Sequence, residues 1–478
     1  MWRTYVICVL IGLLLVSTGG SVLLERQVLS AQADADRLRQ RVAAAESAQA
    51  KLQQQLDQLK VATPGARPTP GAPATLVPNP SSATVPNFRV GGADTATLQL
   101  IEDEVSGLRG LQPRTQVPLR FLDQPALQQY FVDRFNQDYL PSERESDQKL
   151  LATLGLISST DSVTQILLDV LQEQVIGVYN PDDKVMYLVT SDNGQFGPEE
   201  KDTFAHEYTH ALQDQYFDLT ALEPKHPPND DRSLAVLALS EGDAVLMQRL
   251  WAQEKLSQDE INQLGQGGAD SKLFSAPAFL RDQLLFPYSD GFNFVRQIYQ
   301  AGGGYAGVDD VFRDPPDSTA QILHPEKYRG HVKPVDVSLP DLSAGSLGDG
   351  WRKINSNVLG ELDIRLILSQ LTDSSHGVRG SGGWSGDRWE LLEKAGRQAL
   401  VIESVWDTPD DANNFFQTWG LAMQNRFHTA TPEESSATRQ ALTTPTAATD
   451  LRRTGQTVLA VISFDRPSAD AIATAVAP

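Results

Sequence analysis

Residues 4–24 contain no charged side chain, and this stretch limits the structure of the N-terminal region more than any other feature. A helix rises about 1.5 Å per residue, so this stretch would span about 30 Å, the thickness of the hydrocarbon core of a bilayer. The sequence therefore predicts a transmembrane signal-anchor over residues 1–25. A cleaved secretory signal is the alternative interpretation, because small residues at 17–21 suit a cleavage site.

The next two segments predict a stalk and a linker. Apolar residues recur at alternating spacings of four and three from Leu24 to Leu59, a heptad pattern typical of a coiled coil. Residues 26–61 are expected to form either a coiled-coil stalk that joins copies of the chain into a homo-oligomer or one long amphipathic spacer helix. Residues 62–91 are rich in Pro, Ala, Thr and Ser, so they predict an extended linker without a core.

The chain from residue 92 onward has enough apolar residues for a packed core, since 40% of the whole sequence is hydrophobic. The formal net charge of −21 argues against a nucleic-acid partner, because binding to phosphates needs a clustered basic face. Cys8 is the single cysteine of the sequence. Disulfides within the chain, cysteine-based zinc sites and catalytic thiols are therefore excluded from residue 92 onward.

A β-hairpin followed by a helix is predicted near the middle of the chain. Residues 174–190 contain two β-rich runs separated by Asn-Pro-Asp-Asp, and the next helix is predicted to begin at Pro198, with two glutamates in its first turn. The strand predicted before this hairpin covers residues 117–123. Helices are predicted over residues 125–139, 143–156, 161–174 and 233–251.

The predicted helix that begins at Pro198 contains the motif HEYTH. His206 and His210 are four residues apart, so both imidazoles project from one helix face and can bind one metal ion. Glu207 lies where a carboxylate can reach a water molecule on that ion. The motif therefore predicts a zinc site with Glu207 as the general base, against the alternative of a helix with two exposed histidines.

Glu241 is the expected third metal ligand. It lies 31 residues after His210 among small and apolar neighbours, where a carboxylate is costly unless it is paired or bound to a metal. The alternative is an ion pair with Arg232 or Arg249. Asp243 is two residues further on and faces another side of the helix, so it is not expected to be a ligand. His226 lies in a Pro-flanked loop and is expected at the surface.

HEYTH followed about 30 residues later by a helix with the sequence EGDA resembles the gluzincin metallopeptidases, and the longer strings HEYTHALQDQYFDL and STAQILHPEKY resemble a family of prokaryotic zinc metalloproteases. The resemblance covers residues 160–330. It implies two histidines and one glutamate on zinc, with Glu207 as the base. Val245 stands where the Glu-x-x-x-Asp motif of the thermolysin pattern has its aspartate, a residue that supports a ligand without binding the metal. Asp214 is expected either to orient an imidazole in its place or to face solvent.

Two further residues are candidates for stabilising an oxyanion. Tyr288 precedes a predicted helix in a setting similar to that of a stabilising tyrosine in several gluzincins, and His324 lies next to Pro325. The alternatives are a packed aromatic side chain and a hydrogen-bonded turn histidine. Arg313 is a weaker candidate.

A small α/β domain is predicted for residues 341–478, behind the zincin-like body of residues 92–340. Its predicted elements are strands over 398–407 and 457–464 and a helix over 409–426. Residues 384–388 are expected to form a Gly-rich turn, with contact to substrate as the alternative, and residues 429–450 a polar loop. The fold class is therefore expected to be α+β.

The function expected from these features is that of a membrane-anchored zinc metallopeptidase with one Zn²⁺ per chain and a peptide or protein substrate. It would be a single-pass protein of the cell membrane, with its body outside the cytoplasm. One alternative is a catalytically inactive zincin-like scaffold that binds partners. The other is a zinc amidohydrolase that cleaves non-peptide amides or cell-wall crosslinks.

Overall fold

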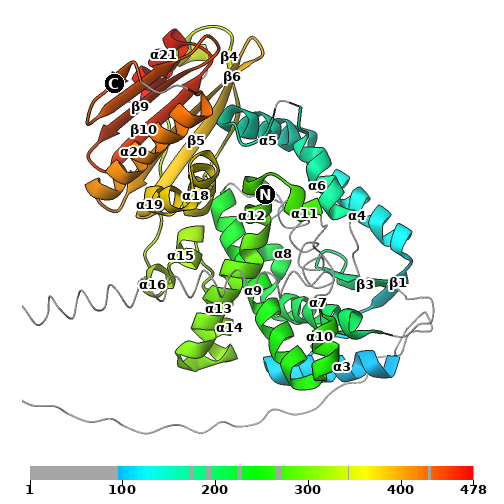
Figure 1. Ribbon diagram of the computed structural model, residues 1–478. Helices are drawn as coiled ribbons and strands as arrows, with labels where there is room; N and C mark the ends of the chain where they lie inside the picture. The colour runs from blue at the N-terminus through cyan, green and yellow to red at the C-terminus, as the bar shows by residue number, and fades with distance from the viewer. Residues whose placement is uncertain are drawn as a thin grey trace, which may run out of the picture. The chain divides into compact units, whose positions relative to one another are not determined.

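The computed structural model describes residues 95–158, 160–172, 177–189, 196–222, 229–264, 272–342, 344–428 and 432–476 (Figure 1). The predicted anchor, stalk and linker lie outside these residues, as does His226. Among the helices of the described ranges, none is long and apolar enough to cross a membrane. The described residues mix helices with two sheets, which confirms the predicted α+β class.

The first half of the described chain is mainly helical. In chain order its elements are α3 (Thr95–Arg109), β1 (Leu119–Leu122), α4 (Gln124–Asp138), α5 (Pro141–Leu154), α6 (Val163–Leu171), β2 (Gly177–Asn180), β3 (Val185–Val189), α7 (Pro198–Phe217), α8 (Leu219–Leu222), α9 (Asp230–Lys255), α10 (Gln258–Gln263), α11 (Lys272–Ser275), α12 (Ala278–Phe286), the π-helix η1 (Pro287–Gly291), α13 (Phe292–Ile298), the π-helix η2 (Tyr299–Gly303), α14 (Tyr305–Arg313), α15 (Thr319–Leu323) and α16 (Pro325–Arg329).

The second half is built around a larger sheet. Its elements are α17 (Ala344–Leu347), β4 (Trp351–Asn357), α18 (Gly360–Leu371), α19 (Ser374–Ser381), β5 (Trp384–Lys394), β6 (Arg397–Trp406), α20 (Pro409–Arg426), β7 (Glu434–Ser435), β8 (Arg439–Thr443), β9 (Ala448–Thr454), β10 (Thr457–Ser463) and α21 (Arg466–Val476).

The smaller sheet has the strand order β1-β3-β2, with β1 parallel and β2 antiparallel to the central strand β3. The predicted hairpin is confirmed, because β2 and β3 are joined by the turn at residues 181–184. Oδ1 of Asn180 accepts a hydrogen bond from the backbone N–H of Asp182, which closes this turn as an Asx-turn. The edge strand β2 is therefore fixed close to α7, with which it is in contact.

Helices α7 and α9 pack against each other at the centre of the first half (Figure 1). Helix α7 begins at Pro198, as predicted, and its first turn carries Glu199 and Glu200, which favour the positive end of the helix dipole. The side chain of Asn229 caps α9 by accepting a hydrogen bond from Arg232 N. Both helices are buried on all faces along much of their length, so their polar residues face other protein groups.

A close approach of two glycines fixes the position of α9 against η1. A Cβ atom on Gly242 would overlap the backbone carbonyl of Gly291, and a Cβ on Gly291 would overlap the carbonyl oxygen of Ala238. Only glycine lets the two backbones approach this closely. The glycine that follows Glu241 is therefore a packing requirement that sets where this glutamate lies.

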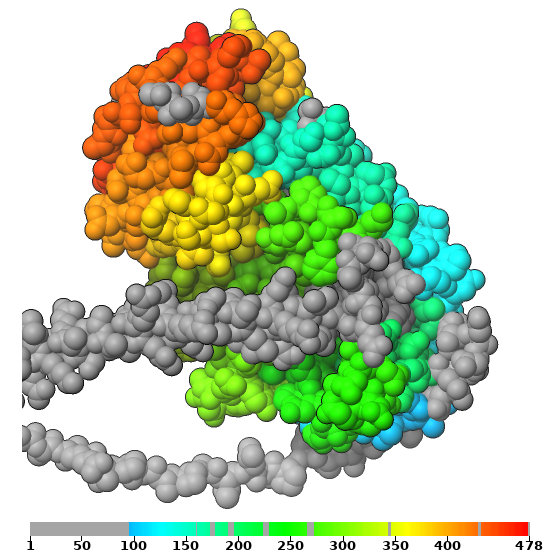
Figure 2. All heavy atoms as spheres, in the orientation of Figure 1, coloured from blue at the N-terminus to red at the C-terminus, as the bar shows by residue number. Residues whose placement is uncertain are grey.

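The larger sheet has the antiparallel order β4-β5-β6-β10-β9-β8-β7. Alternate residues of its strands face two cores, since Ile402 and Val458 pack with the apolar residues of α20 whereas Val401 and Leu459 pack with those of α21. The core on the α20 side continues into the helices of the first half. Backbone N of Phe279 on α12 donates to the side chain of Gln370 on α18, and the two regions adjoin in Figure 2 (green and yellow).

Two predictions for the second half are wrong. Residues 384–388 begin the strand β5 instead of forming a turn, and Gly386 lies at an irregularity of the register with β6. The expected loop at 429–450 contains β7, β8 and the start of β9, at one side of the sheet. The buried carboxylate of Asp450 in β9 is satisfied by an ion pair with Arg439 of β8. The helix predicted over residues 409–426 is confirmed with these bounds.

Candidate metal centre

His206 and His210 on α7 and Glu241 on α9 form one cluster. They are the group within the described ranges whose side chains could hold a metal ion, with ligand atoms that all lie within 4.8 Å of one another. The two histidine Nε2 atoms are 3.1 Å apart, and Oε2 of Glu241 lies 3.3 Å from Nε2 of His206 and 3.4 Å from Nε2 of His210. The structure thus brings the three predicted ligands together.

These distances fit a tetrahedral ion. Atoms bound to one tetrahedral zinc at about 2.0–2.2 Å lie about 3.3 Å from each other, which is the spacing of the three atoms here. Neither oxygen of Glu241 accepts a hydrogen bond of normal geometry, although the side chain is fully buried. A buried carboxylate without a donor needs a positive charge beside it. The two imidazoles and the carboxylate therefore fit a divalent metal with one position left open.

The charges within the cluster act on one another. Burial alone would raise the pKa of Glu241, but the neighbouring imidazoles of His210 and His206 lower it to about 2. Burial alone would lower the pKa of His210, but the charge of Glu241 raises it to about 9. Burial lowers the pKa of His206, against the opposing effects of Glu241 and Gln248. The carboxylate thus attracts positive charge into the cluster.

Glu207 lies beside the three ligands and is held by the edge strand. Its Oε2 accepts a hydrogen bond of 2.7 Å from the backbone N–H of Tyr179 in β2, while its Oε1 has no hydrogen-bond partner. Burial raises the pKa of Glu207 to about 8. Because the N–H of Tyr179 points to Glu207 and not to β3, the unpaired edge of β2 faces α7.

A glutamine and an aspartate lie behind His210, and the sequence pattern alone did not identify them. Nδ1 of His210 is 2.9 Å from Oε1 of Gln213, and Nε2 of Gln213 donates to the backbone oxygen of Ser240 at 2.9 Å and to Oδ2 of Asp243 at 2.8 Å. As predicted, Asp243 faces a different side of α9 from Glu241. That side meets Gln213 of α7. The sequence signal that could have identified Asp243 is the one used for Glu241, an acidic residue among the small and apolar residues of the same predicted helix.

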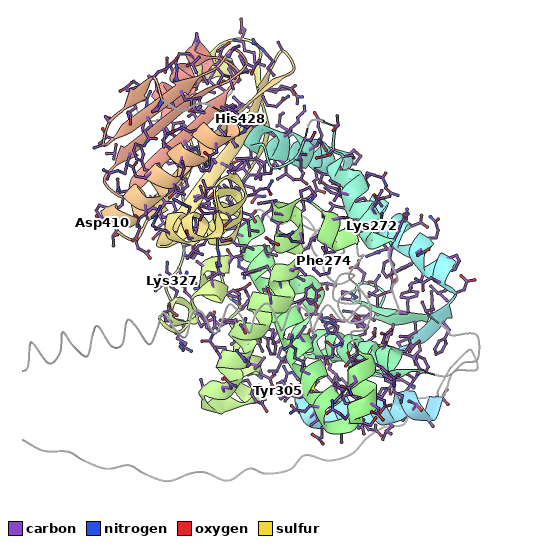
Figure 3. All side chains as sticks on the ribbon, in the orientation of Figure 1. Lys272, Phe274, Tyr305, Lys327, Asp410 and His428 are labelled. Carbon is purple, nitrogen blue, oxygen red and sulfur yellow. The ribbon has the colours of Figure 1, made fainter. Side chains whose placement is uncertain are left out.

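Arg109 extends this network to α3. Its Nε donates to Oδ2 of Asp243 at 3.0 Å, and its Nη1 lies 2.8 Å from Oδ1 of Asp309 on α14. The guanidinium also lies over the ring of Tyr305, 4.5 Å from the centroid; Tyr305 is labelled in Figure 3. Arg109 is 1% exposed, so its charge depends on these partners.

Asp214 does not orient an imidazole, and it does not face solvent. Its carboxylate accepts hydrogen bonds from the hydroxyl of Tyr179 at 2.7 Å and from Nζ of Lys184, and it is buried. It also accepts a hydrogen bond from the backbone N of Leu219. Asp214 therefore ties the β2–β3 hairpin to the C-terminal end of α7.

The two oxyanion candidates lie in different surroundings. Tyr288 is buried in η1, which packs on α9 beside Glu241. His324 follows α15, and its Nε2 lies 2.6 Å from Oε1 of Glu361 at the start of α18. The hydrogen bond with Glu361 raises the pKa of His324. Arg313 is exposed and pairs with Asp310. A catalytic role for Tyr288 or His324 stays a prediction.

The ion pair proposed as the alternative for Glu241 does not form with Arg232, because Arg232 lies beside Asp317. Arg249 lies over the ring of Phe292, 4.2 Å from its centroid. Oε2 of Glu241 instead lies 3.3 Å and 3.4 Å from Nε2 of the two imidazoles. This favours the metal interpretation of the cluster.

A second group of buried carboxylates lies where three helices begin. Asp231 in the first turn of α9 accepts hydrogen bonds from the backbone N and the hydroxyl of Thr319 at the start of α15. Asp387 of β5 accepts hydrogen bonds from the backbone N–H groups of Leu359 and Gly360 at the start of α18, and from the indole of Trp384. These carboxylates cap helix N-termini. We call Asp231, Thr319, Asp387 and their backbone donors the capping junction.

Comparison with known proteins gives one family match. Residues 350–473 match the model of a family described as Domain of unknown function (DUF8575), which corresponds to the larger sheet with α18 to α21. No curated protein and no solved structure matches the chain.

Proposed function

We propose that this chain is a zinc-dependent peptidase that binds one Zn²⁺ through His206, His210 and Glu241 and uses Glu207 as its general base. The observation that carries this proposal is the convergence of three possible ligand atoms at 3.1–3.4 Å from one another, with a second carboxylate, that of Glu207, beside them. Two imidazoles and one carboxylate are a donor set of catalytic zinc sites, which keep one position open.

A zinc ion in this position would activate a water molecule and polarise the carbonyl group of a bound substrate. A bound cation would favour the ionised form of Glu207 against the burial that raises its pKa. The carboxylate is then suited to accept the proton, because the backbone N–H of Tyr179 fixes one of its oxygens and the other oxygen has no partner. The same carboxyl group can then give the proton to the leaving amine. Tyr288 and His324 are the candidates for stabilising the oxyanion that develops on the substrate.

The position of β2 supports a peptide substrate. It is an edge strand, antiparallel to its neighbour, and its free edge faces the HEYTH helix, as in the zincin arrangement. An extended peptide that adds to this edge would pass the Glu207 carboxylate. The side chains of His206, Glu207 and Glu241 are fully buried, so a peptide reaches them only after part of the chain moves.

The test is to measure zinc and hydrolysis in the same preparations of the full chain. We expect about one zinc per chain by elemental analysis after dialysis and cleavage of an unfolded protein such as reduced casein. Glu207→Gln should keep the zinc and lower the rate at least a hundredfold, because it removes the base. Glu200→Gln, the same change in the first turn of α7, is the matched control and should cleave at the wild-type rate.

The outcomes distinguish the peptidase from the alternative functions. Absence of bound zinc would overturn the metal centre and favour the scaffold alternative. Bound zinc without cleavage of any unfolded protein would favour the amidohydrolase or an inactive scaffold. Near wild-type cleavage by Glu207→Gln would contradict the role of this base. Attachment to the cell membrane through residues 4–24, with the body outside the cytoplasm, is part of the same proposal and is tested by fractionation and by protease accessibility of intact cells.

A further inference from the structure

The side chain of Gln213 has one orientation that satisfies its surroundings. Its amide group lies 2.9 Å from the backbone oxygen of Ser240 and 2.8 Å from Oδ2 of Asp243. A carbonyl oxygen and an ionised carboxylate can only accept hydrogen bonds, so the nitrogen of the amide must face both of them. The oxygen of the amide is then left on the side of His210.

This orientation determines the hydrogen on His210. Oε1 of Gln213 lies 2.9 Å from Nδ1 of His210, and an amide oxygen only accepts, so Nδ1 must carry a hydrogen. A neutral imidazole with a hydrogen on Nδ1 has its lone pair on Nε2. Nε2 is the atom that lies 3.4 Å from Glu241 and 3.1 Å from His206.

Asp243 is itself fixed from the N-terminal side of the described chain. The same oxygen that accepts from Gln213 also accepts from Nε of Arg109, which is paired with Asp309 on its other side. Arg109 and Asp243 both have fully buried side chains, so the pair is not weakened by solvent. Three helices, α3, α7 and α9, thus contribute one residue each to the chain Arg109–Asp243–Gln213.

We propose that Gln213 is a positioning residue that fixes the tautomer of His210, and that Asp243 and Arg109 act through Gln213. This inference rests on the metal site of the proposed function and adds the residues that prepare one ligand for the metal. Partners of this kind behind a metal-binding histidine change metal affinity by about 10–100-fold when they are removed.

The first test is the zinc affinity of full-chain variants in competition with a chelator. Gln213→Met removes the acceptor with little change of volume, and we expect zinc to bind about 10–100-fold more weakly. Asp243→Leu should weaken zinc by a similar factor. The double variant should bind zinc no more weakly than Gln213→Met alone, because Asp243 acts through Gln213. Asp231→Asn, a buried aspartate of the same helix without contact to a ligand, is the matched control and should keep the wild-type affinity.

The second test reads the tautomer itself. In zinc-loaded chain labelled with ¹⁵N-histidine, Nδ1–H of His210 should give an NMR signal protected from exchange with water, and Gln213→Met should shift it and make it exchange faster. If Asp243→Leu does not fold, Gln213→Met and this signal still decide the matter. Wild-type affinity in Gln213→Met, or additive losses in the double variant, would overturn the inference. A wild-type chain that binds no zinc would instead overturn the proposed function.

Discussion

The candidate metal centre and the capping junction both contain buried carboxylates, but they differ in the hydrogen-bond donors that the carboxylate oxygens receive. Glu241 and Asp387 are each 1% exposed or less. Asp387 receives two backbone N–H groups and an indole N–H, whereas neither oxygen of Glu241 has a normal hydrogen bond. Burial raises the pKa of Asp387 to about 6, while the imidazoles lower that of Glu241 to about 2.

This difference separates a carboxylate that the folded backbone satisfies from one that, under the proposed function, would bind a metal ion. Helix N-termini supply donors to Asp387 as part of the folded backbone, so its cost of burial is offset without any further group. Glu241 has only two imidazoles, which are themselves metal ligands by type. The candidate metal centre is distinguished by a buried carboxylate that lies beside two imidazoles and receives no backbone or indole N–H group.

The largest effect should come from Glu241→Gln. We expect zinc affinity to fall at least a thousandfold, more than for a residue behind a ligand, because a charged ligand is lost. The free energy of unfolding of the zinc-free chain should also fall, because the attraction between the carboxylate and the two imidazoles, which lowers the pKa of Glu241, is lost. Chelator competition measures the zinc affinity and urea unfolding measures the stability. Wild-type zinc affinity in this variant would place Glu241 with the structural acids.

Asp387→Ala should lower stability without weakening zinc binding. Three donors lose their acceptor, so we expect the chain to lose about 3 kcal/mol of unfolding free energy while a folded preparation binds zinc with the wild-type affinity. Urea unfolding and chelator competition are again the measurements. Weaker zinc binding in this variant would mean that the two regions are coupled and that the comparison fails.

The capping junction should contribute to the pH dependence of stability, in the same direction as Glu207 and His210, whose pKa values are also raised. The pKa of Asp387 is raised from 3.8 to about 6, so its contribution is fully present below about pH 4 and is lost as the pH rises through 6. This amounts to about 2 kcal/mol between pH 4.5 and pH 7. His324, whose pKa is also raised, acts in the same direction above pH 6.5. Urea unfolding of the zinc-free chain at these pH values should give this slope, and a flat profile in wild type would contradict it.

The smallest effect is expected from deletion of residues 1–90. The described core begins in α3, where Leu98, Ile101 and Val105 are buried, so the shortened chain should unfold within about 0.5 kcal/mol of the full chain and bind zinc equally. Deletion of residues 1–110 is the contrasting variant, because it removes Arg109 and should weaken zinc. Loss of folding in the shorter deletion would show that the N-terminal region is structural.

Local patterns in the sequence predicted helices α4, α5, α6, α7, α9 and α20 and the three candidate metal ligands. The proline at position 198 and the spacing of His206, His210 and Glu241 depend on residues close in the chain or on the cost of a single buried charge. Gln213 and Asp243 could not be found in this way, since their roles depend on contacts between helices and on Arg109, more than 130 residues before Asp243. Both roles predicted for Asp214 were wrong, because its hydrogen-bond donors Tyr179 and Lys184 lie in the β2–β3 hairpin and not in the adjacent turn of α7.

The strands within residues 429–450 were missed for a related reason. Their side chains are polar and lack a clear alternation, so nothing local separates them from a loop. Strand β8 exists because β9 supplies its hydrogen-bond partners, and β9 in turn pairs with β10. Asp450 is buried there only because Arg439 and Arg452 lie beside it. Such pairing is a property of the assembled sheet, which a window of sequence does not contain.

Two contacts between the first turn of α9 and later parts of the chain imply an order of events during synthesis. The backbone N of Asp230 donates to the side chain of Asn357, and Thr319 satisfies Asp231, so the first turn of α9 is completed by residues made long after it. On the ribosome all three metal ligands emerge before either partner exists. Since domains fold as units when their contacts become available, we expect the first turn of α9 to be completed only after the larger sheet has left the ribosome. A stalled chain ending before residue 319 would carry HEYTH and Glu241 while the start of α9 still lacks both partners.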